Sequence, residues 1–223
     1  MGLVDLIFPK TCLGCGKSGR YLCKLCLRRK IFLRQVCPMC LSPSIDGITH
    51  IKCKAPYGMD GLFVCFTYEG VVKKAIKTIK YKFVSDLKNE LADLISLSLK
   101  KRVNSLPKKG VLVPIPIYKK RENWRGFNHV EEIAKALDFG HVNLVIKTKE
   151  TKPQSSLMGK KRRKNLIGVF SLNKKFKLKL KKIRKNSAIL FDDVFTTGST
   201  MREACKVLKR NGFKSVWGLS IAR

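Results

Sequence analysis

The residue types and spacing that point most directly to chemistry lie between Ala188 and Thr200. An apolar run there ends in two adjacent carboxylates, Asp192 and Asp193, and a loop of small residues follows: Thr196, Thr197, Gly198, Ser199 and Thr200. Backbone N–H groups and hydroxyls at the N-terminus of a helix favour a phosphate. Ionised carboxylates accept hydrogen bonds from ribose hydroxyls or enter a Mg²⁺ shell. A plain strand–turn–helix junction would explain the aspartates but not the whole run, so the spacing predicts a site for a phosphorylated ribose.

A second chemically active group, near the N-terminus, consists of four Cys/His pairs with two residues between the members of each pair. The first two pairs provide four thiolates, and the next two provide three thiolates and one imidazole: Cys12, Cys15, Cys23 and Cys26, then Cys37, Cys40, His50 and Cys53. This spacing predicts two tetrahedral zinc sites that are structural, because four protein ligands leave no open position. The second site depends on one histidine, which a surface position would also explain. Disulfides are the competing interpretation, and a cytosolic location disfavours them.

Hydrophobic spacing predicts the elements that position the phosphate-binding run. Ile189 to Phe191 has the short apolar pattern of a buried parallel strand. From Met201 onward, apolar residues recur at the spacing of one helix face, and Val216 to Ile221 is typical of the next strand. Residues 192–200 are therefore expected at the carboxyl end of a strand, where open α/β sheets bind ligands.

The middle of the chain completes an α/β pattern. Residues 68–99 are predicted to be helical with a break near 83–85, residues 111–116 to be a strand that ends in a turn, and residues 130–137 to be a helix. The expected fold class is α/β, with a mostly parallel sheet flanked by helices. A length of 223 residues favours one large domain, residues 59–223, and a small metal-binding module, residues 1–58.

Composition limits the partners and the location. The 48 lysines and arginines against 15 aspartates and glutamates give a net charge of +33, which attracts polyanions. The charge is concentrated in residues 160–164 and 174–185, and alternating apolar residues in the second stretch favour a basic hairpin arm as much as a linker. Nucleic acid and phosphorylated ligands are the candidate partners, with a solvated lysine-rich face as the alternative. Without an apolar run of about 18 residues or a signal peptide, a cytoplasmic protein without membrane insertion is expected.

Several short motifs occur in order along the chain: the cysteine knuckles, I-K-Y-K around Lys80, V-P-I-P, R-G-F-N, T-K-P-Q with R-R-K-N-L-I-G-V-F, and D-D-V-F-T-T-G-S-T. Together they resemble the ComF family of DNA-uptake (competence) proteins, which includes ComFC and GntX-like proteins, over nearly the whole chain. The last motif resembles the binding motif for 5-phosphoribosyl-1-pyrophosphate (PRPP) in type I phosphoribosyltransferases. The resemblance implies a type I phosphoribosyltransferase fold with a small N-terminal double zinc ribbon.

The resemblance also implies roles for individual residues. Asp192 and Asp193 would bind the ribose hydroxyls of Mg²⁺-PRPP, residues 196–200 its 5-phosphate, and Arg125 its pyrophosphate. Residues 147–165 would form a mobile loop over the site, with these members: Thr151, Gln154, Arg162 and Asn165. Lys80 would lie in a family signature at a helix end, without an assigned role.

The chain departs from the family pattern at particular positions. His50 stands where cysteine is often found, His129 where glutamine commonly follows R-G-F-N, and Lys147 where arginine is common. Lysine cannot give phosphate the planar bidentate grip of arginine. The basic stretch 174–185 also looks longer than the turn that is usual in the family.

Three kinds of function are compatible with these features. The first is an enzyme that transfers a phosphoribosyl group from PRPP to an acceptor that the sequence does not name, with no catalytic residue that can be nominated. The second is a non-catalytic protein of DNA uptake that binds single-stranded DNA and uses the phosphoribosyl site to sense a ligand. The third is an adaptor whose zinc ribbon docks a helicase or ATPase partner of the ComF operon.

Overall fold

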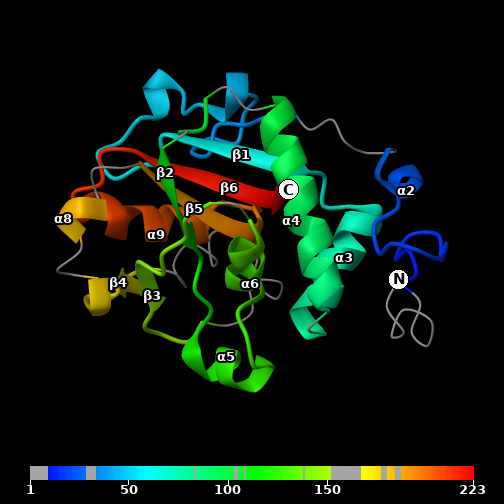
Figure 1. The fold of residues 1–223 in the computed structure, drawn as a ribbon. Helices are drawn as coiled ribbons and strands as arrows, with labels where there is room; N and C mark the ends of the chain where they lie inside the picture. The colour runs from blue at the N-terminus through cyan, green and yellow to red at the C-terminus, as the bar shows by residue number, and fades with distance from the viewer. Residues whose placement is uncertain are drawn as a thin grey trace.

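The computed structural model describes residues 10–28, 34–82, 84–102, 105–107, 109–137, 139–151, 167–176, 180–183 and 187–223. Within these residues, four parallel strands form the central sheet in the order β1-β6-β5-β2 (Figure 1). The strands are β1 (Gly61–Phe66), β2 (Gly110–Pro114), β5 (Ser187–Val194) and β6 (Val216–Ala222). The prediction of an α/β fold with a mostly parallel sheet is confirmed.

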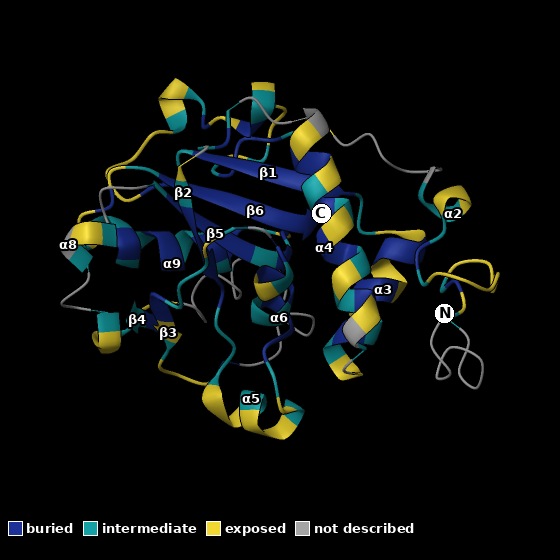
Figure 2. Cartoon of the chain, viewed as in Figure 1, coloured by how far each residue is buried: buried dark blue, intermediate teal, exposed yellow. Residues whose placement is uncertain are grey.

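Helices cover both faces of this sheet. One face carries α3 (Gly70–Tyr81), α4 (Ser85–Arg102) and α6 (His129–Ala136), and the other carries α9 (Ser199–Arg210) (Figure 1). Alternate residues of a strand point to opposite faces, so Ile189 and Phe191 pack with the first group while Ala188 and Leu190 pack with α9. Because both faces are covered, the strands are buried along their length (Figure 2).

The predicted elements agree with the structure except at their ends. The expected break at 83–85 separates α3 from α4, and the predicted strand 111–116 stops at Pro114. The apolar face expected from Met201 onward is buried in full: Met201, Ala204, Cys205 and Leu208. Hydrophobic periodicity predicted these elements correctly because their apolar residues are buried together in the core.

The remaining elements are short. They are α2 (Lys24–Arg28), η1 (Ile45–Gly47), η2 (Ile51–Cys53), α5 (Lys119–Arg125), β3 (Val145–Lys147), β4 (Phe170–Leu172), η4 (Lys174–Phe176) and α8 (Leu180–Ile183). Strands β3 and β4 pair antiparallel as a separate small sheet within the described residues. No helix in the described part of the chain has the length and apolar character needed to cross a membrane.

The expectation of a basic hairpin arm over 174–185 is wrong for the described part of that stretch. Its residues form the helical turns η4 and α8 instead of paired strands. Phe176, Leu180 and Ile183 pack against the core on the α9 side. Their spacing of four and three residues suits a helical face, whereas the alternation that favoured strands depended on Leu178, which lies outside the described residues.

The described parts of the cysteine-rich segment contact the sheet domain at several places, of which two bear on the fold. Cys12 and Leu22 join the core beneath α3 and α4, and Glu90 of α4 accepts hydrogen bonds from the N–H groups of Tyr21 (3.1 Å) and Leu22 (2.9 Å). Farther along, the amide side chain of Gln35 pairs with both backbone groups of Val64, at 3.0 and 2.9 Å. Val64 lies on β1 at the end of the sheet order, so the Gln35 amide satisfies backbone groups that an edge strand leaves open. The boundary near residue 58 stays a prediction.

Candidate functional site

The loop after β5 is held in a tight shape at the N-terminus of α9. Gly198 has a φ of +72°, and a Cβ atom at this position would lie 2.5 Å from the ring of Phe195. Only glycine fits this combination of backbone angle and close approach. Within the loop, the hydroxyls of Thr197 and Ser199 are 2.8 Å apart and hydrogen-bonded. Gly198, Ser199 and Thr200 line a cavity at the carboxyl end of the sheet, so the N-terminus of α9 lies where a phosphate site is expected.

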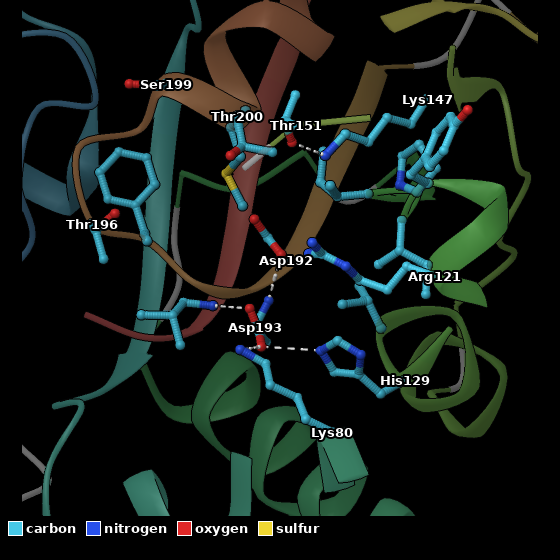
Figure 3. A pocket seen from close by; sticks show the side chains of 18 of the residues that line it. Lys80, Arg121, His129, Lys147, Thr151, Asp192, Asp193, Thr196, Ser199 and Thr200 are labelled. Atoms are coloured by element: carbon cyan, nitrogen blue, oxygen red, sulfur yellow. Dashed lines mark hydrogen bonds and ion pairs between the residues drawn. The ribbon is translucent and has the colours of Figure 1, made fainter. Parts of the chain in front are cut away.

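This loop forms one wall of a cavity of about 450 Å³, which lies within the size range of small-molecule sites. Asp192, Thr196, Gly198, Ser199 and Thr200 line it from the β5–α9 side. Basic and imidazole side chains also line the cavity, among them Lys80, Arg121, His129 and Lys147 (Figure 3). Arg125 is another of the lining residues. A cavity with a helix N-terminus on one side and several cations on the other suits a ligand with negative charge at both ends.

The two adjacent aspartates have different surroundings. The carboxylate of Asp193 forms an ion pair with Lys80 and accepts a hydrogen bond from His129 Nε2 at 3.0 Å. Asp192 lies on the side of Thr200, away from Lys80 and His129 (Figure 3). Its Oδ1 atom accepts a hydrogen bond from the N–H of Asp193 at 2.9 Å. Both aspartates line the cavity, but only Asp193 is tied to two neighbouring elements through Lys80 and His129.

The charges of these groups follow from their surroundings. Burial and the neighbouring Asp193 charge raise the pKa of Asp192. Burial alone would raise the pKa of Asp193 too, but His129 and Lys80 hold it well below its usual range. Burial alone would lower the pKa of Lys80, and its pKa is nevertheless raised because Asp193 and Asp192 outweigh that effect. The Lys80–Asp193 pair therefore stays charged in neutral solution.

His129 occupies a fixed tautomer in this network. Its Nδ1 atom lies 3.0 Å from Arg125 Nη1, and a guanidinium can only donate. The Nδ1 atom must therefore be the acceptor, and Nε2 carries the proton that it donates to Asp193. Burial lowers the pKa of His129, with Asp193 opposing this shift, so a neutral ring agrees with both hydrogen bonds.

The basic wall contains two residues with unusual surroundings. Arg125 stacks its guanidinium 5.6 Å from the centre of the Tyr81 ring, and its Nε is buried without a hydrogen-bond partner among the described residues. Lys147 donates to Thr151 Oγ1 at 2.7 Å, and burial together with the positive charge of Arg121 lowers the pKa of Lys147 to about 8. An anionic ligand would favour the charged form of Lys147.

The two groups of metal-ligating residues assemble as their spacing predicts. In each group, Cys12–Cys15–Cys23–Cys26 and Cys37–Cys40–His50–Cys53, all ligand atoms lie within 4.8 Å of one another. The sulfurs of Cys15 and Cys23 are 3.7 Å apart, close to the separation of about 3.8 Å for two sulfurs that share one tetrahedral zinc ion. Four soft donors around one point fit zinc, which would supply structural cross-linking and no open coordination position.

His50 is oriented as a metal ligand. Its Nδ1 atom lies 3.4 Å from the sulfur of Cys40, while Nε2 is 3.0 Å from the carbonyl oxygen of Pro43. The carbonyl can only accept, so Nε2 carries the proton and Nδ1 is left unprotonated for a metal. This outer hydrogen bond is typical of zinc-binding histidines.

In the first group, burial alone would raise the pKa of Cys12, but N–H groups of Cys15, Cys23 and Gly14 lower it to about 6.

Known proteins resemble this chain over most of its length. Competence protein F of Haemophilus influenzae is 29% identical over 227 residues, covering 95% of this chain and 90% of that protein. DNA utilization protein YhgH of Escherichia coli is 26% identical over 206 residues, covering 87% of each chain. Competence protein ComFC of Streptococcus pneumoniae is 29% identical over 192 residues, covering 84% of this chain and 80% of that protein. No family model matches the chain.

These relatives support a ComF-family protein.

All residues of the predicted phosphoribosyl site except Thr197 line one cavity, and Arg125 is among them. The Nη1 atom of Arg125 is 3.0 Å from His129 Nδ1. Its contact with pyrophosphate stays a prediction. Of the four residues expected in a mobile loop, Thr151 lies at the cavity beside Lys147. The others, Gln154, Arg162 and Asn165, lie outside the described residues.

Sequence reasoning missed part of the site. Lys80 had no predicted role, and His129 was noted only as a departure from the family pattern. Both contact Asp193 from helices far away in the sequence. Arg121 carried no signal, because a lysine and arginine run at 119–121 resembles many other basic runs in this chain.

Proposed function

We propose that this chain binds PRPP, or a related phosphoribosyl ligand with Mg²⁺, in the cavity at the carboxyl end of the sheet and acts in DNA uptake or DNA processing. The arrangement that carries the proposal is a phosphate-type loop and the Asp192 carboxylate on one wall, facing Arg121, Arg125 and Lys147 on the other. The relatives named for competence and for DNA utilization support the biological role.

The chemistry that suits this cavity is departure of pyrophosphate from C1 of the ribose as an acceptor attacks. Fixed positive charge that neutralises the leaving group and holds it in place would be the contribution of this chain. The Asp192 carboxylate can accept hydrogen bonds from ribose hydroxyls or ligate Mg²⁺. The ion would neutralise pyrophosphate charge. Measurement of pyrophosphate release from PRPP tests for transfer.

The test is the substitution Asp192→Asn. We expect it to weaken PRPP binding about 10- to 100-fold, because a charge-assisted hydrogen bond is lost. It should also raise the free energy of unfolding by about 1 kcal/mol at pH about 8. The sign follows from the raised pKa of Asp192: above the ordinary carboxyl pKa of about 4, the folded state must ionise this buried group at a cost, and asparagine removes that cost.

Calorimetry with PRPP and Mg²⁺ measures the affinity, and urea unfolding measures the stability. Asp93→Asn, at an exposed position of α4, is the matched control and should change neither quantity. Absence of PRPP binding by the unaltered chain, or equal affinity in Asp192→Asn, would refute the proposed site.

A second function, binding of single-stranded DNA, is favoured by the net charge of +33. We expect the affinity for a single-stranded oligonucleotide to fall at least about 10-fold between roughly 50 and 200 mM salt, because bound cations are released from each neutralised phosphate. Fluorescence anisotropy across a salt series checks this. An uncharged methylphosphonate oligonucleotide is the control and should bind weakly at every salt concentration. An affinity that is independent of salt would contradict the electrostatic basis of this function.

A further inference from the structure

The guanidinium of Arg202 connects the second cysteine group to the phosphate loop. Its Nε donates to the carbonyl oxygen of Pro38 at 3.0 Å, and its Nη2 donates to the carbonyl oxygen of Thr197 at 2.7 Å. Pro38 stands between Cys37 and Cys40, two members of the second group. One rigid, planar side chain thus holds a metal knuckle and a ligand-binding loop at a fixed separation.

The contact with Thr197 bears on the phosphate site. In a trans peptide the C=O and the following N–H point in opposite directions. Holding the Thr197 carbonyl on Arg202 therefore turns the N–H of Gly198 away from Arg202, and Gly198 lines the cavity. Because Gly198 has a φ of +72° and can adopt many other conformations, the orientation of this peptide needs such an anchor.

The Pro38 carbonyl anchors Arg202 only if the turn from Cys37 to Cys40 has a fixed conformation. Cys37 is fully buried, and its carbonyl accepts a hydrogen bond from the N–H of Leu41 at 2.9 Å. Val36, next to it, packs in the same core cluster as Phe195 and Met201, which flank the phosphate loop. A metal ion bound by Cys37 and Cys40 would fix the Pro38 carbonyl between them, since the two ligands bracket that peptide.

We propose that metal in the Cys37–Cys40–His50–Cys53 group positions the phosphate loop through Arg202, which acts as a positioning residue for the phosphoribosyl ligand. This inference rests on the proposed function. Coupling between two sites is reciprocal, so ligand at the loop should tighten metal binding in this group by the same factor by which metal tightens ligand binding. The first group serves as an internal comparison, because its described hydrogen bonds to the sheet domain go to Glu90 of α4 and not to the loop.

The experiment compares Cys40→Ser, which removes a ligand of the second group, with Cys15→Ser, the matched exposed ligand of the first. We expect Cys40→Ser to weaken PRPP binding about 5- to 30-fold and Cys15→Ser to leave it within about 2-fold. His50→Cys, which keeps four ligands, should retain the affinity of the unaltered chain. Arg202→Met should retain both metal ions but lose the coupling, so that PRPP no longer changes the Zn²⁺ affinity of the second group in a chelator competition.

Amide hydrogen exchange of residues 197–200 gives a readout that needs no ligand. Both Cys40→Ser and Arg202→Met should increase exchange at these amides at least about 10-fold, because the loop opens more often when its anchor is lost. If the unaltered chain does not bind PRPP, the proposed function fails and the exchange data alone decide whether the loop is positioned. If exchange, PRPP affinity and Zn²⁺ affinity are the same with and without Arg202, the inference is overturned. Should Cys40→Ser fail to fold, Arg202→Met carries the test.

Discussion

Replacing Lys80 with methionine is expected to lower the free energy of unfolding by about 2–3 kcal/mol, because it leaves the buried carboxylate of Asp193 without its charged partner. The side chain of Asp193 is only 10% exposed. Breaking a fully buried ion pair costs about 3–5 kcal/mol, and the smaller figure here reflects the 27% exposure of Lys80. Urea unfolding at neutral pH measures the loss.

Two further variants separate this effect from a general loss of packing. Lys77→Met makes the same substitution at an exposed position of α3, and it should change stability by less than about 0.5 kcal/mol. Adding Asp193→Asn to Lys80→Met should restore much of the lost stability, because the uncompensated charge disappears while His129 can still donate to the amide oxygen. Additive losses in the double variant would show that the ion pair is not the cause.

The pH dependence of the Lys80 variant has a definite sign. Asp193 has a pKa below its usual range, so its contribution to stability is present above the ordinary carboxyl pKa of about 4 and is lost as pH falls through the lower folded value. Without Lys80 the folded pKa rises toward the ordinary value. The variant should therefore lose most of the stability that ionised Asp193 contributes above pH about 4. The difference in unfolding free energy between the variant and the unaltered chain should shrink as the pH falls, because the unaltered chain loses this contribution too.

The different fates of the two aspartates show where prediction from sequence stops. Their position after a buried strand was predictable, because hydrophobic spacing is a local property. Their surroundings were not, because the partners of Asp193 come from α3 and α6, and only the packed sheet brings these helices to the end of β5. From the sequence, Asp192 and Asp193 are expected to play the same part, whereas in the structure both line the cavity and Asp193 alone forms the ion pair with Lys80.

The cysteine groups illustrate the opposite case. Each pair with two intervening residues forms its own tight turn, so that local spacing already determines which side chains converge. For His50, the sequence favoured a metal ligand but left a surface histidine open, and its hydrogen bond to Pro43 could not be predicted from spacing. The connection from Arg202 to Pro38 spans the chain from α9 to the knuckle and has no local signal at all.

We expect zinc to bind both cysteine groups, and its removal is the change with the largest expected effect on stability. Structural zinc contributes about 10–16 kcal/mol of apparent binding free energy in small zinc-binding units at neutral pH. The sheet domain has its own apolar core, so only part of the zinc binding free energy should appear as stability of the whole chain. We therefore expect removal of both ions to lower the free energy of unfolding by at least about 5 kcal/mol. Circular dichroism during unfolding in urea, with and without a strong chelator, checks this.

Metal content of single variants then assigns the ions to the two groups. The unaltered chain should hold two zinc ions, and Cys12→Ser and Cys40→Ser should each hold one, because each removes one of four ligands from a different group. Cys205→Ala, at a buried cysteine of α9 outside both groups, is the control and should keep two. Zinc should be released as the pH falls, since thiolates and imidazole must lose their protons to bind it.

Disulfide bonding is the alternative that this measurement must exclude. A disulfide requires a sulfur–sulfur distance of about 2.05 Å, whereas Cys15 and Cys23 are 3.7 Å apart and every described cysteine is a free thiol. Four thiols around one point without metal would oxidise readily once deprotonated, because the thiolate is the reactive form. Intact-mass measurement under non-denaturing conditions should therefore find two zinc ions and fully reduced cysteines. A metal-free chain with paired cysteines and unchanged stability under chelation would contradict the zinc assignment.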